Sequence, residues 1–308
     1  EETKFLQEKR QEREGSIWGR ANSFIIASTL NWLSRKPVPN HVAFIMDGNR
    51  RYAKSLGLEK IQGHVSGFDK LLNILEWCLK LKIKTVTVYA FSIENFKRPK
   101  HEVEGLMSLA EEKFIEFLEH ESLVMQHGVK VRILGNLQLL PKKVKRAVAN
   151  VMLHTKDNSN ALLNICFPYS SKEEITRLTQ NTVIALKSGK LKDSDIDYQF
   201  LSNCLYTRGN EPDLLIRTSG ETRLSDFLVW QLRFACLQFV PVLWPDLTLW
   251  DLVWCILRFQ TSAPSLRNLR NTFSKQSIED EESTLRKQNH LESLDLKEDK
   301  LLLSWVSE

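Results

Sequence analysis

The sequence predicts an α/β protein built on an open, largely parallel sheet flanked by helices. Two observations support this prediction. Short apolar runs rich in β-branched and aromatic residues alternate with longer segments of helical periodicity, and turn residues separate them. The chain has 308 residues and is 42% hydrophobic, which is enough for one large domain with its own core.

The strands are expected at 42–46, 84–91, 129–135, 162–167 and 213–218, with a short one at 236–240. Between them, apolar residues recur at helical spacing over 68–81 and from Pro99 to near Gly128. Further helices should follow Pro141, start near Ser171, and run from a capping box at Thr248 and Asp251 through Phe259.

Charged or polar segments at both ends divide the chain into 1–36, 37–262 and 263–308. In the first part an amphipathic helix is expected, with one apolar face made by Trp18, Ile25, Ile26, Leu30 and Leu33. This face could lie in a membrane interface or pack on the protein's own core, and the sequence leaves both open. The last part is a helical or loose charged tail that ends in apolar "LLLSW", a docking or dimer contact.

Bulk composition excludes several classes of protein. No apolar stretch reaches the roughly 18–20 residues that cross a bilayer. A formal net charge of +5 is too mild to indicate nucleic acid binding. The five cysteines form no C-x-x-C pair and mostly sit in apolar runs, so buried free thiols and a reducing compartment are expected.

Charged and polar residues follow several of the expected strands. Because the carboxyl ends of parallel strands meet at one edge of a sheet, these residues should share a rim where ligands bind. The first strand is followed by Asp47, Gly48, Asn49, Arg50 and Arg51, the second by Ser92, Asn95 and Arg98, and 213–218 delivers Arg217, Arg223 and Ser225. Lys60 and His64 are expected between the first helical turn and the next helix.

This set of side chains suits a phosphorylated ligand. Gly48 lets backbone N–H groups approach a phosphate closely, and arginine forks bind phosphate oxygens in pairs. Asp47 would repel a phosphate unless a divalent cation lay between them, and Mg²⁺ binds through one or two carboxylates plus substrate phosphates. Neither a P-loop nor a G-x-G-x-x-G after a strand is present, so no dinucleotide cofactor is expected.

The sequence resembles the cis-prenyltransferases, the ditrans,polycis-polyprenyl diphosphate synthases. The matching motifs run in family order from about Pro39 to Phe259. They are "HVAFIMDGNRRYAK", "GHVSGF", "TVYAFSIENFKRP", "EVEGLM", "LIRTSGETRLSDFLVWQ" and "PVLWPD". Within the family, the chain is most similar to the eukaryotic dehydrodolichyl diphosphate synthase catalytic subunits.

The resemblance implies a role for each rim residue. Asp47 would hold Mg²⁺ on the allylic diphosphate, and Ser92, Asn95 and His64 would act near the reacting groups. The allylic diphosphate would be bound by Gly48, Asn49, Arg50, Arg51, Lys60 and Arg98, and isopentenyl diphosphate by Arg217, Arg223 and Ser225.

Three departures from the single-chain bacterial enzymes bear on activity. Lys60 stands where those enzymes have arginine, and Cys236 where they have a metal-assisting glutamate. Their R-x-G triad is missing after Phe259. In two-subunit eukaryotic enzymes a Nogo-B receptor-like partner supplies it, so the chain resembles the active half of a heteromer, with a dimer of heterodimers as one arrangement.

The implied activity condenses isopentenyl diphosphate onto farnesyl diphosphate with cis double bonds, for dolichol synthesis and protein glycosylation. The product would grow into an apolar tunnel and leave into the endoplasmic reticulum membrane, with the enzyme peripheral on its cytoplasmic face. A non-catalytic partner of the same fold is the alternative, although the retention of Asp47, Arg51, Arg217 and Arg223 argues against it. A phosphohydrolase would need a second acid where Asn49 stands, and the basic residues do not form a nucleic acid stripe.

Overall fold

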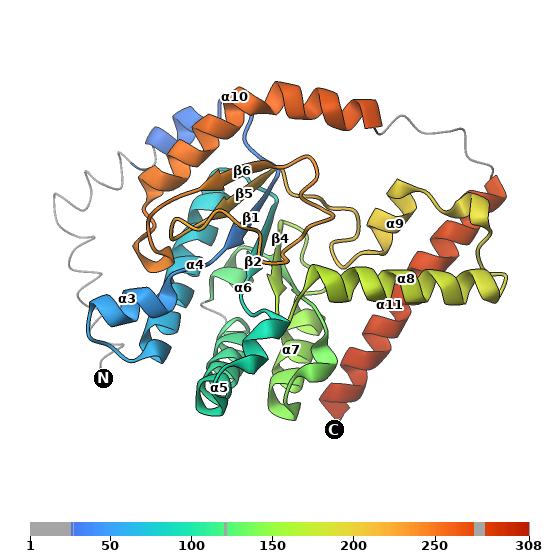
Figure 1. The fold of residues 1–308 in the computed structure, drawn as a ribbon, viewed down its shortest axis with the longest axis horizontal. Helices are drawn as coiled ribbons and strands as arrows, with labels where there is room; N and C mark the ends of the chain where they lie inside the picture. Colours follow the sequence, from blue (N-terminus) through green and yellow to red (C-terminus); the bar gives the residue numbers. More distant parts are fainter. Residues whose placement is uncertain (1–25, 27, 120–121, 274–280, 308) are drawn as a thin grey trace.

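The computed structural model describes residues 26, 28–119, 122–273 and 281–307 (Figure 1). Within these residues lies a six-stranded sheet in the order β3-β4-β2-β1-β5-β6, in which all neighbouring strands are parallel. The strands are β1 (His41–Ile45), β2 (Thr85–Tyr89), β3 (Val129–Leu134), β4 (Ala161–Cys166), β5 (Leu214–Arg217) and β6 (Cys236–Phe239). The predicted fold class and all six strand positions are therefore confirmed.

Helices connect the strands and cover both faces of the sheet (Figure 1). The α-helices are α3 (Asn49–Ser55), α4 (Lys60–Lys80), α5 (Lys100–Glu116), α6 (Leu123–Gln126), α7 (Lys142–His154), α8 (Ser171–Lys187), α9 (Tyr198–Cys204), α10 (Leu249–Phe273) and α11 (Glu281–Ser307). Short 3₁₀ turns are η1 (Ile93–Lys97), η2 (Leu137–Leu139), η3 (Asp193–Asp195) and η4 (Trp244–Asp246).

Alternation along the strands divides the core into two sides. In β1, Val42 and Phe44 join a large cluster with residues of α4, α5, α7 and α10. Ala43 and Ile45 point to the other side, where they pack with Tyr89 and the segment around Phe227. All five residues of β1 are buried, as expected for a central strand of a parallel sheet.

Three helices differ from the sequence expectation. Lys60 and His64 lie on α4 itself and not in a loop before it, because Glu59 and Gln62 form a capping box that starts the helix eight residues earlier than predicted. The long helix expected from Pro99 to near Gly128 ends at Glu116, and a new one, α6, begins where the Ser122 hydroxyl accepts from the Met125 N–H. The helix that opens at Thr248 continues past Phe259 to Phe273.

Both ends of the described chain pack on the main core. Residues 28–33 are helical, and Leu30 and Leu33 are buried in the large cluster, whereas Trp18 and Ile25 lie outside the described residues. At the other end, α11 buries Leu302 and Trp305 in the same cluster, so "LLLSW" docks on its own chain. Among the helices that the structure describes, none has the length and apolarity to cross a bilayer.

The five cysteines are all buried free thiols, as predicted. Burial raises the pKa of Cys78 and Cys255 to about 12, so these thiols stay protonated and unreactive. Cys236 begins β6 opposite Leu214, whereas Arg217 pairs with Phe239 at the far end of the same two strands. Within one chain, Cys236 therefore lies at the opposite end of the sheet from the rim.

Candidate active site

The register of the sheet brings three predicted rim segments together. Ile45 at the end of β1 pairs with Tyr89 at the end of β2 and with Arg217 at the end of β5. Asp47 follows β1 by two residues, so the first and fifth strands deliver their charged residues to the same edge. The expectation of a shared rim is met for these segments.

Asp47 and Arg217 form the centre of one half of the rim. The Arg217 Nη2 donates to the Asp47 Oδ2 over 2.9 Å, and the Arg217 side chain is 3% exposed. Thr218 fixes the backbone of Asp47, because its hydroxyl accepts from the Asp47 N–H at 3.0 Å and donates to the Asp47 carbonyl at 2.7 Å. Arg217 and Thr218, at the end of β5, thus hold both the carboxylate and the backbone of Asp47.

The loop after β5 wraps around Arg217. The Arg217 Nη1 donates to the Ser225 Oγ at 2.8 Å and to the Arg223 carbonyl. The Arg217 Nε is buried without a partner. The Arg223 side chain pairs with Glu221 and is 63% exposed, so its guanidinium is accessible to a ligand. Arg51 reaches the same place from α3, where it bonds the Ser219 hydroxyl and lies 3.7 Å from the Asp47 Oδ1.

This loop has a second anchor on α8. The Asp226 carboxylate accepts from the Ser170 hydroxyl at 2.6 Å and from the Lys172 N–H at 3.2 Å. Ser225 and Asp226 have φ of 50° and 59°, a left-handed conformation that costs energy for side chains other than glycine. The loop is therefore held in a conformation that presents Ser225 to Arg217.

Gly48 and Asn49 mark a close approach of backbone segments. Gly48 has φ of 111°, and a Cβ there would meet Leu243 at 2.9 Å. Asn49 starts α3 and packs against two glycines of α4, since a Cβ on Gly63 or Gly67 would come within 2.2 Å and 2.5 Å of its atoms. Its Oδ1 is buried without a partner in the described structure, so it is free to accept a hydrogen bond.

The second half of the rim gathers around Glu102, which sequence reasoning did not single out. Its carboxylate lies 3.1 Å from the Lys60 Nζ, 3.3 Å from an Arg98 Nη and 3.6 Å from an Arg50 Nη. Burial acts to raise the pKa of Glu102, but Lys60, Arg98 and Arg50 outweigh it and hold that pKa below its ordinary value. The sequence contained no helical signal for this pair, because Arg98 lies in extended backbone between η1 and α5 and not on the helix that carries Glu102.

His64 sits beside this group in its neutral form. Burial lowers the pKa of His64 to about 4, and the neighbouring positive charges of Arg98 and Arg50 act in the same direction against the opposing Glu102. Its Nε2 is buried without a partner. At neutral pH the imidazole can therefore donate or accept one hydrogen bond but carries no charge.

Ser92 and Asn95 make local contacts at the start of η1. The Ser92 N–H donates to the Asn95 Oδ1 at 3.1 Å, and the Ser92 hydroxyl accepts from the Glu94 N–H at 3.2 Å. They cap this turn between β2 and α5. They are not among the described residues that line the cavity below, so their predicted place beside the reacting carbons stays a prediction.

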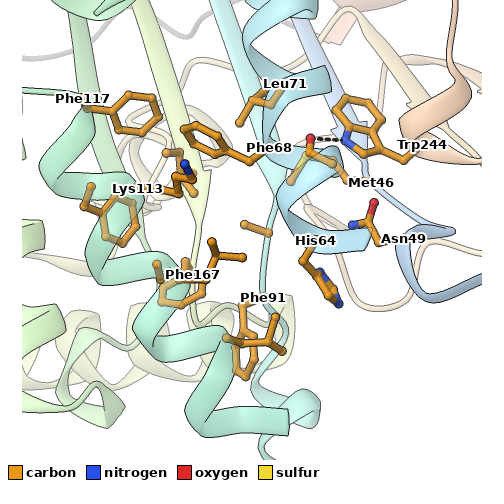
Figure 2. Close-up of a pocket in the computed structure, with 17 residues that line it drawn as sticks. Met46, Asn49, His64, Phe68, Leu71, Phe91, Lys113, Phe117, Phe167 and Trp244 are labelled. Atoms are coloured by element: carbon orange, nitrogen blue, oxygen red, sulfur yellow. Dashed lines mark hydrogen bonds between the residues drawn. The ribbon is translucent and has the colours of Figure 1, made fainter. Parts of the chain in front are cut away.

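An apolar cavity opens from the rim into the large core (Figure 2). In Figure 2, Asn49 and His64 lie on one side of it and Phe117 on the other. Its walls come from α4, α5 and the strands, as expected for an apolar tunnel. Besides Asn49 and His64, the lining residues are Met46, Gly67, Phe68, Leu71, Ala90, Phe91, Leu106, Leu109, Ala110, Lys113, Phe114, Phe117, Ile165, Phe167 and Trp244.

A parallel α/β sheet with a charged rim at its carboxyl edge and an apolar cavity beneath is the arrangement of a prenyl diphosphate synthase. The family model of undecaprenyl diphosphate synthases, a prenyltransferase model, matches residues 45–266. The chain belongs to this family, the cis-prenyltransferases, and is a prenyltransferase.

Within this family, the chain is similar to dehydrodolichyl diphosphate synthase complex subunits. The chain is 46% identical over 283 residues to the dehydrodolichyl diphosphate synthase complex subunit DHDDS of Homo sapiens, covering 90% of this chain and 83% of that one. It is 41% identical over 233 residues to a dehydrodolichyl diphosphate synthase complex subunit of Schizosaccharomyces pombe, covering 75% and 88%. The crystal structure of lavandulyl diphosphate synthase from Lavandula x intermedia in complex with dimethylallyl diphosphate superposes with a TM-score of 0.69 at 32% identity, covering 72% of this chain and 95% of that chain.

Proposed function

We propose that this chain is the catalytic subunit of a cis-prenyltransferase that adds isopentenyl diphosphate units to farnesyl diphosphate. The product is a long-chain dehydrodolichyl diphosphate for dolichol synthesis. The observation that supports this most directly is the continuity between a cationic rim and an apolar cavity, since Asn49 and His64 belong to both. A substrate with a charged head and an isoprenoid tail matches both parts.

The two halves of the rim suit two diphosphates. Arg50, Lys60 and Arg98 surround Glu102 next to the cavity-lining His64, and they would bind the allylic diphosphate together with the backbone at Gly48. Arg223 and Ser225 would bind isopentenyl diphosphate. Arg217 would join them by exchanging the Asp47 carboxylate for a phosphate oxygen.

Asp47 would hold the Mg²⁺ that the family's chemistry implies. Among the described residues no three His, Cys, Asp or Glu side chains group into a metal site. A single carboxylate nevertheless fits Mg²⁺, because this ion takes one or two carboxylates and completes its shell with substrate phosphates and water. The Asp47 side chain is 31% exposed, so one oxygen remains reachable from solvent. When bound, the ion would neutralise charge on the departing diphosphate.

The proposed reaction breaks the allylic carbon–oxygen bond, and pyrophosphate leaves with the bonding electrons. The double bond of isopentenyl diphosphate then forms the new carbon–carbon bond, and loss of one proton creates the cis double bond. The residues contribute by aligning the two esters and stabilising the leaving group. The proton acceptor stays open among a phosphate oxygen, Asn95 and His64.

An accessory subunit is proposed as the partner. Relatives are named as complex subunits, and the printed sequence has no R-x-G triad after Phe259. A suitable surface exists at β6, an edge strand of the sheet, where Leu237 is 41% exposed. On the adjoining α10, Trp250 and Trp254 are 57% and 60% exposed one helical turn apart. Unpaired strand edges and exposed aromatic residues mark partner surfaces.

A peripheral position on the cytoplasmic face of the endoplasmic reticulum membrane is proposed from the hydrophobicity of the product. The predicted N-terminal anchor receives no support from Leu30 and Leu33, which pack inside the protein. Trp32 is 50% exposed beside them and is the described residue that would face a lipid surface.

The test is incubation of the chain with labelled isopentenyl diphosphate, farnesyl diphosphate and Mg²⁺, with and without a Nogo-B receptor-like subunit. Long-chain polyprenyl diphosphate with the partner and little without it supports the proposal. No product in either case would favour the alternative, a non-catalytic subunit of the same fold.

The same assay tests the cavity as the site of chain growth. Ala110 lines it on α5, so Ala110→Phe should shorten the product by several isoprene units. Ile115 is on the same helix but 53% exposed, and Ile115→Phe is the matched control that should leave product length unchanged. Equal product lengths would place the growing chain elsewhere.

A further inference from the structure

Glu102 is a buried anion inside a ring of otherwise accessible cations. Its side chain is 6% exposed, whereas those of Arg50 and Lys60 are 51% and 58% exposed. Each cation therefore turns one donor inward to Glu102 and keeps others facing solvent. The Arg98 side chain is more enclosed, at 20% exposure.

The carboxylate is kept ionised by its position as well as by its partners. Glu102 lies in the first turn of α5, and its N–H bonds the Pro99 carbonyl at 2.9 Å. The positive end of a helix favours an anion there. Without this carboxylate three like charges would face one another, and burial already lowers the pKa of Arg98, with Arg50 acting in the same direction.

One carboxylate against three cations leaves the group with a net charge of about +2. A diphosphate oxygen would therefore be attracted to the outer donors of the same side chains that Glu102 holds from inside. The two anions share the three cations, and each weakens the hold of the other. A fully positive ring would bind diphosphate more tightly than this one does.

We propose that Glu102 is an internal counter-anion that limits the affinity of Arg50, Lys60 and Arg98 for diphosphate, so that pyrophosphate leaves after each condensation. This inference rests on the proposed function, because it takes a diphosphate as the ligand of these cations. Glu102 is a positioning residue: it acts through the three cations. An enzyme that adds many units must empty this site once for each unit.

Titration of the full chain with inorganic pyrophosphate by calorimetry, with Mg²⁺ and again in EDTA, tests the inference. Glu102→Gln keeps the shape and removes the charge, and it should lower the pyrophosphate dissociation constant about tenfold. In steady state it should lower kcat through slower release, without lowering kcat/KM for farnesyl diphosphate. Glu104→Gln, at an exposed position of the same helix, is the matched control and should change neither.

The possible outcomes distinguish failure of the proposed function from failure of the counter-anion role of Glu102. If the wild-type chain binds no pyrophosphate, the proposed function fails. If it binds and Glu102→Gln binds equally or more weakly, Glu102 only positions the cations and the counter-anion is refuted. Should Glu102→Gln not fold, Glu102→Asp decides, because withdrawing the carboxylate by one methylene must tighten pyrophosphate binding in the same direction by a smaller factor.

Discussion

The two halves of the rim hold their cations in different ways. Arg217 is buried, and its guanidinium is committed to Asp47, Ser225 and the Arg223 carbonyl. Arg50 and Lys60 are more than half exposed and share one carboxylate with Arg98. A buried arginine whose two Nη atoms are both bonded fixes geometry, whereas exposed cations around one acid can adjust to a ligand. We infer that the first half orients isopentenyl diphosphate and that the second half captures the allylic diphosphate and releases pyrophosphate.

Asp47→Asn should produce the largest loss, because it leaves the buried Arg217 guanidinium without its carboxylate and removes the proposed metal ligand. We expect kcat/KM to fall by about 10³ or more, measured with the accessory subunit present. Asp193→Asn, at an exposed position of η3, is the control for loss of a carboxylate. A variant with near wild-type turnover and intact circular dichroism would show that Asp47 is dispensable.

Arg217→Lys should rank second. A lysine presents one ammonium point and cannot serve Asp47, Ser225 and the Arg223 carbonyl together as the planar fork does. We expect kcat/KM for isopentenyl diphosphate to fall about 100-fold, since the loop after β5 loses the bonds that place it. Steady-state kinetics at saturating farnesyl diphosphate measure this. A change of less than threefold would mean that Arg217 does not determine the geometry of the first half of the rim.

Arg50→Lys makes the same substitution in the exposed half and should have a much smaller effect. Its contact with Glu102 is an ion pair at 3.6 Å from a half-exposed side chain, which a lysine can reproduce. We expect less than about a threefold rise in KM for farnesyl diphosphate and little change in kcat. Equal losses for Arg50→Lys and Arg217→Lys would remove the distinction between the two halves.

The difference between the two halves of the rim also explains which of their residues could be predicted from the sequence. The sheet followed from apolar runs such as 42–46, and the first half of the rim followed from the strand ends that carry Asp47 and Arg217. Asp47 and Arg217 could be predicted to lie close together because the carboxyl ends of parallel strands meet at one edge of a sheet. The role of Glu102 was not visible, because a glutamate in a helix is usually solvated and only the packing of α4 on α5 buries it against Lys60. Lys60 and His64 were misplaced in a loop because the Glu59 capping box was overlooked.

The pH dependence of stability gives the smallest expected effect. It depends on His64, which is buried beside the cations of the second half of the rim. His64 is neutral in the folded protein down to about pH 4, because burial, and then Arg98, lowers its pKa. In the unfolded chain it binds a proton near pH 6.5, so between 6.5 and 4 the unfolded state holds more protons and stability falls as the pH falls. Within this window the wild type should lose up to ~1.4 kcal/mol per pH unit more than His64→Gln, measured by urea denaturation.

His101→Gln, at an exposed position on α5, is the control for loss of an imidazole. Parallel stability curves for wild type and His64→Gln would mean that His64 accepts a proton in the folded state as readily as in water. Burial and the positive charges of Arg98 and Arg50 would then not disfavour the imidazolium form at this place. A clear divergence of the curves between pH 6.5 and 4 would instead show that His64 stays neutral in the folded protein, as its burial and then the positive charges of Arg98 and Arg50 require.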